Sequence, residues 1–187
     1  MKYLILVKHS LPEILEQLPA REWHLSEEGA RRAGVLADKL RPYQPDVILT
    51  SVEPKAVQTA EIVANALALE MMVAPNLHEH ERSRIPFLAQ EVFESRIQEF
   101  FEKPDELVVG NETAEQAHDR FQQAVSSVLK TYADQTIIII AHGTVISLFV
   151  SHLTGVPAFP LWKQLGLPAY LVLDMNSHTI NAQENVS

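Results

Sequence analysis

The feature that most constrains the fold of this chain is a run of strand-forming residues, Thr136 to Ala141, which contains four consecutive isoleucines. β-Branched residues pack well in strands, and an apolar run without polar alternation is typical of a central strand. A helical pattern of apolar residues starts at Gly143, directly after the run and His142. The run therefore predicts the central strand of a sheet that is covered on both faces.

Shorter patterns of the same two kinds alternate along the rest of the chain. Further strands are predicted at 3–7, 46–50 and 71–74, and two more, at 169–174 and 179–182, form a C-terminal hairpin. Helical patterns begin near 26, 54, 87, 113 and 143, with Ser26 as the N-cap of the first and a capping box from Thr113 to Gln116. This alternation indicates an α/β protein: a three-layer sandwich with a mostly parallel central sheet, helices on both faces and the hairpin at one edge.

The length of the chain, 187 residues, favours one domain spanning residues 1–187. The pattern changes between about 75 and 110, where a charged segment precedes a helix that is rich in phenylalanine. Because loops and excursions from a sheet commonly carry function, we expect this segment to cover a site.

Composition excludes several functional classes. The chain has no cysteine, so disulfides, thiolate catalysis and cysteine-ligated metals are ruled out. Its formal net charge of −9 argues against nucleic acid or an anionic membrane as a partner. The apolar run near the N-terminus is too short for a signal peptide or a membrane span, so we expect a cytoplasmic protein.

Two histidines, His9 and His142, each follow a predicted strand directly. Because parallel strands end at the same edge of a sheet, these imidazoles are expected to meet there, together with Lys8, Lys55 and Glu79. A neutral imidazole can attack phosphorus, and the phosphoryl group in transfer mainly needs cations and N–H donors around its oxygens. The residues at this edge therefore indicate phosphoryl chemistry.

The motifs around these residues resemble those of the histidine phosphatase superfamily, which has the phosphoglycerate-mutase-like fold. An apolar strand ending in Arg-His-Gly is matched by Leu6 to Ser10, and the family's Ala-His-Gly is present at Ala141 to Gly143. Four further motifs lie in order between them: Leu-Thr-x-x-Gly-x-x-Gln-Ala at 25–33, Ser-x-x-x-Arg-Ala-x-Gln-Thr-Ala at 51–60, Leu-x-Glu at 77–79 and Gly-Gly-Glu-Ser at 110–113. Six motifs in the family's order, spanning residues 4 to about 155, make the resemblance specific.

The resemblance implies that the chain hydrolyses a small phosphorylated substrate without a metal or a cofactor. His9 takes the place of the nucleophile that forms a phosphohistidine, Glu79 that of the proton donor, and His142 that of a second phosphate-binding histidine. Lys8 and Lys55 stand in the places of two phosphate-binding arginines. Since lysine keeps the charge of arginine but lacks its bidentate fork, the exchange predicts weaker binding of phosphate and reduced activity.

Other residues near this edge are open candidates. Ser10 stands where the family has glycine, and its hydroxyl is a candidate donor to phosphate. Glu81 competes with Glu79 for the role of the acid because both lie in the same charged segment. Three arginines lie in segments expected near the edge and are candidates to supply the guanidinium groups that Lys8 and Lys55 lack: Arg21, Arg82 and Arg84.

Three alternative functions stay open. A catalytically weak member of the same fold would bind a phosphorylated ligand or partner, which the two lysines favour. Mutase-type phosphoryl transfer would use the same nucleophile, although the chain offers little sequence to enclose a phosphorylated intermediate. A zinc hydrolase would use His9, His142 and Glu79 as ligands, but the two lysines would repel the cation. The identity of the substrate and the oligomeric state are not determined by the sequence.

Overall fold

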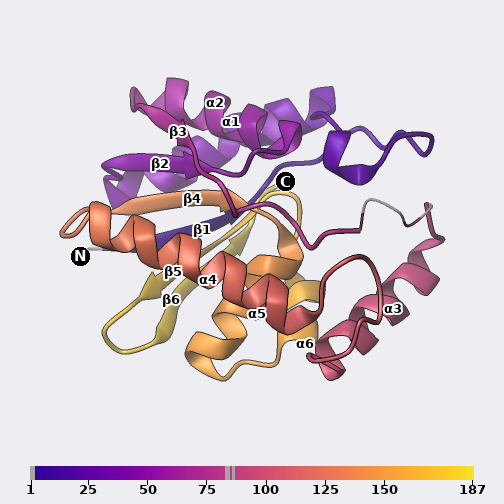
Figure 1. Cartoon of the computed structure of the whole chain (residues 1–187). Coiled ribbons are helices and arrows are strands. Elements are labelled where there is room, and N and C mark those ends of the chain that lie inside the picture. Colours follow the sequence, from indigo (N-terminus) through magenta and orange to yellow (C-terminus); the bar gives the residue numbers. More distant parts are fainter. Residues whose placement is uncertain (1–2, 83–84, 86) are drawn as a thin grey trace.

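The computed structural model describes residues 3–82, 85 and 87–187 of the chain and contains a six-stranded sheet (Figure 1). In their order across the sheet, the strands are β3 (Met71–Val73), β2 (Val47–Thr50), β4 (Ile137–Ala141), β1 (Leu4–Lys8), β5 (Ala169–Asp174) and β6 (Thr179–Asn185). The first four are parallel, whereas β5 runs antiparallel to β1 and β6 antiparallel to β5. The predicted mostly parallel sheet with a C-terminal hairpin at one edge is therefore confirmed.

Helices cover both faces of the sheet, as Figure 1 shows. One face carries α1 (Glu27–Leu40) and α2 (Pro54–Leu67), and the other carries α4 (Ala114–Thr131) and α5 (Gly143–Thr154). The remaining helices are shorter or lie further from the sheet: η1 (Ala20–Glu22), η2 (Arg41–Tyr43), α3 (Gln90–Glu102) and α6 (Ala158–Gln164). This arrangement confirms the predicted three-layer α/β fold.

The central strands divide their side chains between two cores. In β1, Leu4 and Leu6 lie in the core beneath α4 and α5, whereas Ile5 and Val7 lie in the core beneath α1 and α2. The isoleucines of β4 alternate in the same way, and the whole strand is buried. Since successive side chains of a strand point to opposite faces, an unbroken apolar run is what a strand between two helical layers requires.

Two helix starts agree with the sequence predictions. The Ser26 hydroxyl oxygen accepts a hydrogen bond from the Gly29 N–H at 3.0 Å and caps α1. At the start of α4, Thr113 and Gln116 form the complete capping box. None of the helices within the described ranges combines the length and the apolar character that crossing a membrane requires.

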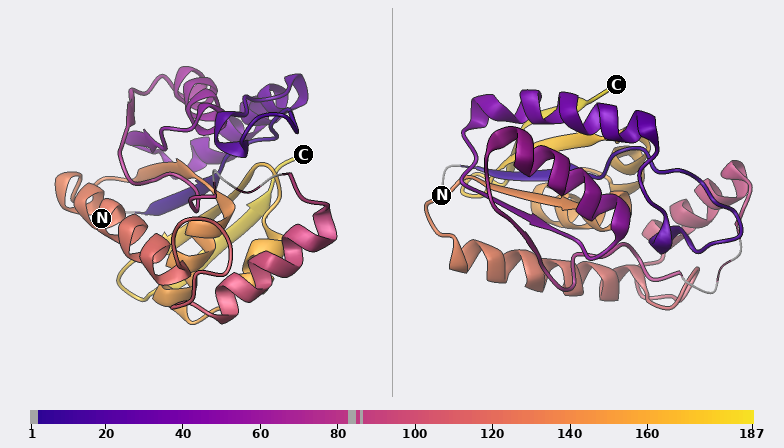
Figure 2. Two further views of the ribbon diagram at one scale, coloured as in Figure 1. Left: turned by 45° about the vertical axis from the view of Figure 1, so that its right-hand side comes forward. Right: turned by 90° about the horizontal axis from the view of Figure 1, so that it is seen from above.

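The connection from β1 to α1 and helix α3 lie at the same end of the molecule (Figure 2). The rings of Trp23, in that connection, and Phe87, just before α3, are 6.5 Å apart. Helix α3 in turn packs against α6, where the rings of Phe93 and Trp162 are 6.0 Å apart. This is the end at which β1 delivers His9, so these segments surround the edge at which the sequence predicts the site.

Candidate active site

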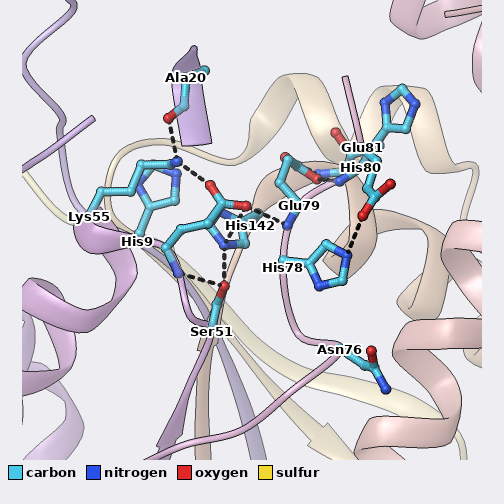
Figure 3. Close-up of polar contacts among 12 residues, drawn as sticks. His9, Ala20, Ser51, Lys55, Asn76, His78, Glu79, His80, Glu81 and His142 are labelled. Carbon is cyan, nitrogen blue, oxygen red and sulfur yellow. Dashed lines mark hydrogen bonds and ion pairs between the residues drawn. The ribbon is translucent and has the colours of Figure 1, made fainter. Parts of the chain in front are cut away.

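The carboxyl ends of three neighbouring strands bring the first site residues together. β2, β4 and β1 are adjacent and parallel, and they end directly before Ser51, His142 and His9. Two backbone hydrogen bonds continue the sheet past the strand ends: the His9 N–H donates to Ala141 and the Ser51 N–H to Ile140, each at 3.0 Å. As a result, the rings of His9 and His142 lie with their centroids 5.1 Å apart (Figure 3).

The protonation state of His9 follows from its contacts. Its Nδ1 lies 2.7 Å from the carbonyl oxygen of Ser10, and because a carbonyl only accepts, Nδ1 carries the hydrogen. The lone pair is then on Nε2. Burial, together with the neighbouring His142 and Lys55, holds the pKa of His9 well below its usual range. His9 is therefore a neutral imidazole at pH 7, which is the form that acts as a nucleophile.

His142 is fully buried at the start of α5. Its Nε2 is 2.8 Å from the Ser51 hydroxyl oxygen and 3.5 Å from a carboxylate oxygen of Glu53. Its Nδ1 is buried and has no hydrogen-bond partner among the described residues. Burial and then the charge of Lys55 keep the pKa of His142 well below that of a free histidine, so this ring is neutral as well.

The two lysines enter the site from different sides. Lys55, at the start of α2, is buried and donates from Nζ to the Ala20 carbonyl at 2.8 Å and to the Glu53 carboxylate. Lys8, at the end of β1, donates from Nζ to the Leu165 carbonyl at 2.7 Å. Burial lowers the pKa of Lys8 to about 8, although the negative charge of Glu79 opposes the shift. Each ammonium group keeps at least one further N–H for a ligand.

The segment from 76 to 82 contributes Glu79, whose side chain is only 14% exposed. Its two carboxylate oxygens accept from the backbone N–H groups of His80 at 2.8 Å and Thr144 at 3.2 Å. Burial alone would raise the pKa of Glu79, but Arg82 and these N–H donors outweigh it and lower the pKa to about 2. Glu81 is 53% exposed and faces His78 at 3.4 Å, so Glu79 is the carboxylate of this segment that lies inside the site.

Ser10 differs from its predicted role as a phosphate donor. The residue is fully buried, its N–H donates to the Thr59 hydroxyl oxygen at 3.0 Å, and its own hydroxyl donates to the Gly29 carbonyl at 2.7 Å. A hydroxyl has one hydrogen to donate, and here it is already used. The prediction that Ser10 donates to phosphate is corrected accordingly, because its side chain fastens the end of β1 to the start of α1.

Of the two candidate arginines that the structure describes, Arg21 and Arg82, the second lies in the site. Arg82 is 4.0 Å from the Glu79 carboxylate, its side chain is 20% exposed, and its guanidinium lies 4.8 Å from the centre of the Phe93 ring. Its Nη1 is buried and has no hydrogen-bond partner within the described part of the chain. Arg21 is 62% exposed and pairs with its neighbour Glu22 at 3.6 Å. Arg84 falls outside the residues that the structure describes.

Glu53 and the ion pair of Glu112 and Arg120 also belong to the site, although none of the three was predicted from the sequence as a site residue. Glu53 is buried between Lys55 and His142, and its only sequence signal is its place inside the Ser51-to-Ala60 motif. Arg120 of α4 donates to the backbone carbonyls of residues 76, 78 and 79 at 3.0 to 3.3 Å and to Glu112 at 2.7 Å. Glu112 lies in the predicted Gly110-to-Thr113 motif and also accepts from the Glu81 N–H at 2.9 Å. These residues hold the Glu79 segment against the sheet.

The zinc alternative would need His9, His142 and Glu79 to be arranged as metal ligands. Among the residues outside the gaps at 1–2, 83–84 and 86, no group of three or more histidine, aspartate or glutamate side chains is arranged to hold a metal ion. His9, His142 and Glu79 therefore do not form a ready-made zinc site.

Comparison with known proteins identifies what the chain is similar to. Residues 4–183 match the family described as the histidine phosphatase superfamily (branch 1), so the resemblance found in the sequence is confirmed. The chain is 25% identical over 131 residues to a Bacillus subtilis protein named as the uncharacterized phosphatase PhoE, which covers 70% of this chain. It is 26% identical over 140 residues, 72% of its length, to the probable phosphoglycerate mutase GpmB of Cronobacter sakazakii. In both cases the match spans 65% of the relative's own length.

Solved structures support the same fold. The crystal structure of a phosphoserine phosphatase from Entamoeba histolytica in complex with 3-phosphoglyceric acid superposes with a TM-score of 0.80. The superposition covers 99% of this chain and 98% of that one, at 17% sequence identity. A likeness at this level of identity establishes the shared fold.

Proposed function

The chain belongs to the histidine phosphatase superfamily, branch 1, and from that premise we propose that it hydrolyses small phosphomonoesters through a phosphohistidine on His9. The observation that carries the proposal is the hydrogen bond from His9 Nδ1 to the Ser10 carbonyl. This bond places the lone pair on Nε2 of a neutral ring, with His142, Lys55 and Arg82 close by to meet the charge of a phosphoryl group.

In the proposed first step, Nε2 of His9 attacks phosphorus, the nitrogen–phosphorus bond forms and the bond to the ester oxygen breaks. The phosphoryl oxygens are held by the cations Lys8, Lys55 and Arg82, by His142, and by N–H groups at the start of α5. Arg82 supplies a planar fork that neither lysine has, and its buried Nη1 has no competing hydrogen bond among the described residues. Without that guanidinium, the cations of the site would be two lysine ammonium groups, which cannot bind two phosphoryl oxygens in a bidentate way.

The leaving oxygen takes its proton from Glu79. In the free protein Glu79 is ionised, since its pKa is about 2. A bound phosphate dianion engages Arg82 and adds negative charge beside the carboxylate, and both effects raise the pKa of Glu79 towards that of a proton donor. In the second step, water attacks the phosphohistidine, Glu79 accepts a proton from that water, and phosphate leaves while His9 regains its neutral ring.

We propose that residues 75–110 cover this site and thereby determine much of its substrate preference. The segment supplies Glu79 and Arg82, and Phe93 of α3 stands behind Arg82. Phosphoserine and 3-phosphoglyceric acid, named for the Entamoeba histolytica structure, are small phosphorylated acids of the size that we expect to fit. The mechanism uses no metal and no cofactor.

Mutase-type phosphoryl transfer is a second candidate because the chain matches a probable phosphoglycerate mutase over 72% of its length. The two candidates share the phosphohistidine and differ in its fate. With a phosphoglycerate as substrate, hydrolysis releases inorganic phosphate, whereas mutase action yields the isomeric phosphoglycerate. Following both products by ³¹P NMR separates the two activities.

Rapid-quench trapping with a ³²P-labelled phosphoester tests the proposal. We expect a protein-bound phosphate that is labile to acid and stable to alkali, as a phosphohistidine is, and that is lost in His9→Ala. His178→Ala is the matched control because His178 is exposed in the turn between β5 and β6. Absence of any phosphoenzyme in the unmodified protein at saturating substrate contradicts the proposal.

A further inference from the structure

A carboxylate that the proposed mechanism does not use lies among the phosphate ligands. Glu53 is 7% exposed, and its Oε2 accepts a hydrogen bond from Lys55 Nζ. Its Oε1 accepts from the backbone N–H of Glu79 at 2.8 Å and lies 3.5 Å from Nε2 of His142. One side chain thus contacts two proposed phosphate ligands and the segment that carries the proposed acid.

The position of Glu53 in the chain does not require this orientation. Glu53 is the N-cap of α2, where a side-chain oxygen ordinarily accepts from the first N–H groups of the helix. Its carboxylate makes no such capping bond. The Glu53 N–H donates to the Ser51 hydroxyl oxygen at 3.3 Å, and Pro54 opens the helix, so the backbone is fixed while the side chain turns into the site.

A carboxylate in this position resembles part of a phosphoryl group. It carries negative charge and presents two oxygens to a lysine ammonium, a histidine ring and a backbone N–H, which are the kinds of donor that hold phosphate. A phosphoryl group that contacts Lys55 and His142 lies beside the Glu53 carboxylate, and its oxygens compete with that carboxylate for the same donors. Breaking charge-assisted hydrogen bonds weakens the net gain from forming new ones.

We infer that Glu53 is an intramolecular competitor of the phosphoryl group for Lys55 and His142 and thereby sets the affinity of the site for oxyanions. The inference rests on the proposed function only for the identity of the site. Because the carboxylate opposes substrate, transition state and product phosphate alike, its removal lowers KM and the inhibition constant of phosphate together. A residue that merely positions Lys55 or His142 would instead raise both constants when removed.

Calorimetric titration with inorganic phosphate tests the inference. We expect Glu53→Gln, which keeps the length of the side chain, and Glu53→Ala each to lower the dissociation constant about tenfold, as expected for the loss of one charge-assisted competitor. Glu81→Gln is the matched control: it removes one negative charge from the same end of the molecule, but from a carboxylate that is 53% exposed and faces His78. The control should change the dissociation constant less than twofold, on the order expected of a solvated surface charge.

Unchanged or weaker phosphate binding in both Glu53 variants overturns the inference. A measurement on the unmodified protein does not depend on how the variants fold: in ¹³C NMR, phosphate should shift the Glu53 carboxyl resonance and leave that of Glu81 in place. No shift at Glu53 at saturating phosphate also overturns it. Neither readout depends on turnover. If the chain forms no phosphohistidine, the proposed function is refuted, but the competition between Glu53 and phosphate can still be measured.

Discussion

The two halves of the candidate active site are held in place by different means. The strand-held half consists of Lys8 at the end of β1 and of His9, Ser51 and His142 directly after their strands. Their positions follow from parallel strands and from backbone hydrogen bonds that continue the sheet. The loop-held half is the segment 76–82, which carries Glu79 and Arg82 and contains no helix or strand. Side chains from elsewhere hold it, chiefly Arg120 of α4 and its partner Glu112.

The chemistry depends on the scaffold in the strand-held half and on single side chains in the loop-held half. In the strand-held half, backbone hydrogen bonds of a cooperative sheet hold the chain, so a single substitution outside the reacting residues moves little. In the loop-held half, one guanidinium satisfies several backbone carbonyls at once. We therefore expect the loop-held half to be far more sensitive to changes at a distance from the reacting atoms.

The largest effect should come from removing the acid of the loop-held half. Glu79→Gln keeps the size of the side chain but cannot give a proton to the leaving oxygen, so we expect kcat for an alkyl phosphate to fall about 10²- to 10⁴-fold. With an aryl phosphate, whose leaving group needs no proton, the loss should be much smaller. Steady-state kinetics with the two substrates measure the difference.

Glu81→Gln is the control for this comparison because it makes the same chemical change two residues away on an exposed side chain. We expect its kcat to stay within about twofold of the unmodified protein with both substrates. If Glu81→Gln shows the large, leaving-group-dependent loss and Glu79→Gln does not, the proton donor has been assigned to the wrong carboxylate.

The strand-held half was predictable from sequence for a physical reason. An unbroken apolar run such as 137–141 identifies a central strand, and the carboxyl ends of parallel strands must share an edge, so His9 and His142 were expected to meet. The whole α/β sandwich follows from the same alternation of strand and helix patterns. Local sequence is sufficient to predict this part of the site because each histidine is placed by the strand that directly precedes it.

The other contacts of the site could not be predicted from sequence because they depend on the direction in which each side chain points in the folded protein. Glu112 lies just before α4 and Arg120 lies within it, and their role depends on the distant segment 76–79 being beside them. Glu53 turns towards Lys55 and His142 rather than towards its own helix. Ser10, which sequence placed among the phosphate donors, gives its hydroxyl hydrogen to Gly29 instead. In each case the hydrogen-bond partner follows from the tertiary structure and not from the spacing of residues along the sequence.

A second, intermediate effect should follow from releasing the loop-held half. Arg120→Ala removes the donor to residues 76, 78 and 79 and leaves Glu112, which is 11% exposed, without its partner. We expect the free energy of unfolding to fall by about 2 to 4 kcal/mol, because an unpaired buried carboxylate is costly. We also expect kcat to fall about 10- to 100-fold as Glu79 loses its fixed position. Urea denaturation and steady-state kinetics measure the two quantities.

The matched control is Arg31→Ala on the surface of α1. Arg31 also makes two hydrogen bonds to one glutamate, Glu28, but the pair is largely exposed. Exposed pairs contribute about 0 to 1 kcal/mol, so we expect neither stability nor kcat to change much. Equal effects of Arg120→Ala and Arg31→Ala would show that the loop-held half does not depend on its ion pair.

The smallest effect concerns the strand-held half and its dependence on pH. Burial lowers the pKa of Lys8 to about 8, so its charge is lost as the pH rises through that value. We expect the dissociation constant of phosphate to rise about tenfold between about pH 7 and pH 9.5, since one cation near the oxyanion disappears. In Lys8→Arg the guanidinium stays charged over this range, so the dissociation constant should stay nearly constant.

The stability of the protein should change in the opposite direction over the same range. Between about 8 and the ordinary lysine value of 10.5, the folded chain binds fewer protons at Lys8 than the unfolded chain does. The Lys8 contribution to the free energy of unfolding therefore increases as the pH rises through this window, while phosphate affinity decreases. Comparing thermal unfolding of the unmodified protein with Lys8→Arg isolates this contribution, because every other titrating group is common to both. Parallel pH profiles in the two proteins, in unfolding and in phosphate binding, would mean that Lys8 keeps an ordinary pKa and that its charge does not limit this half of the site.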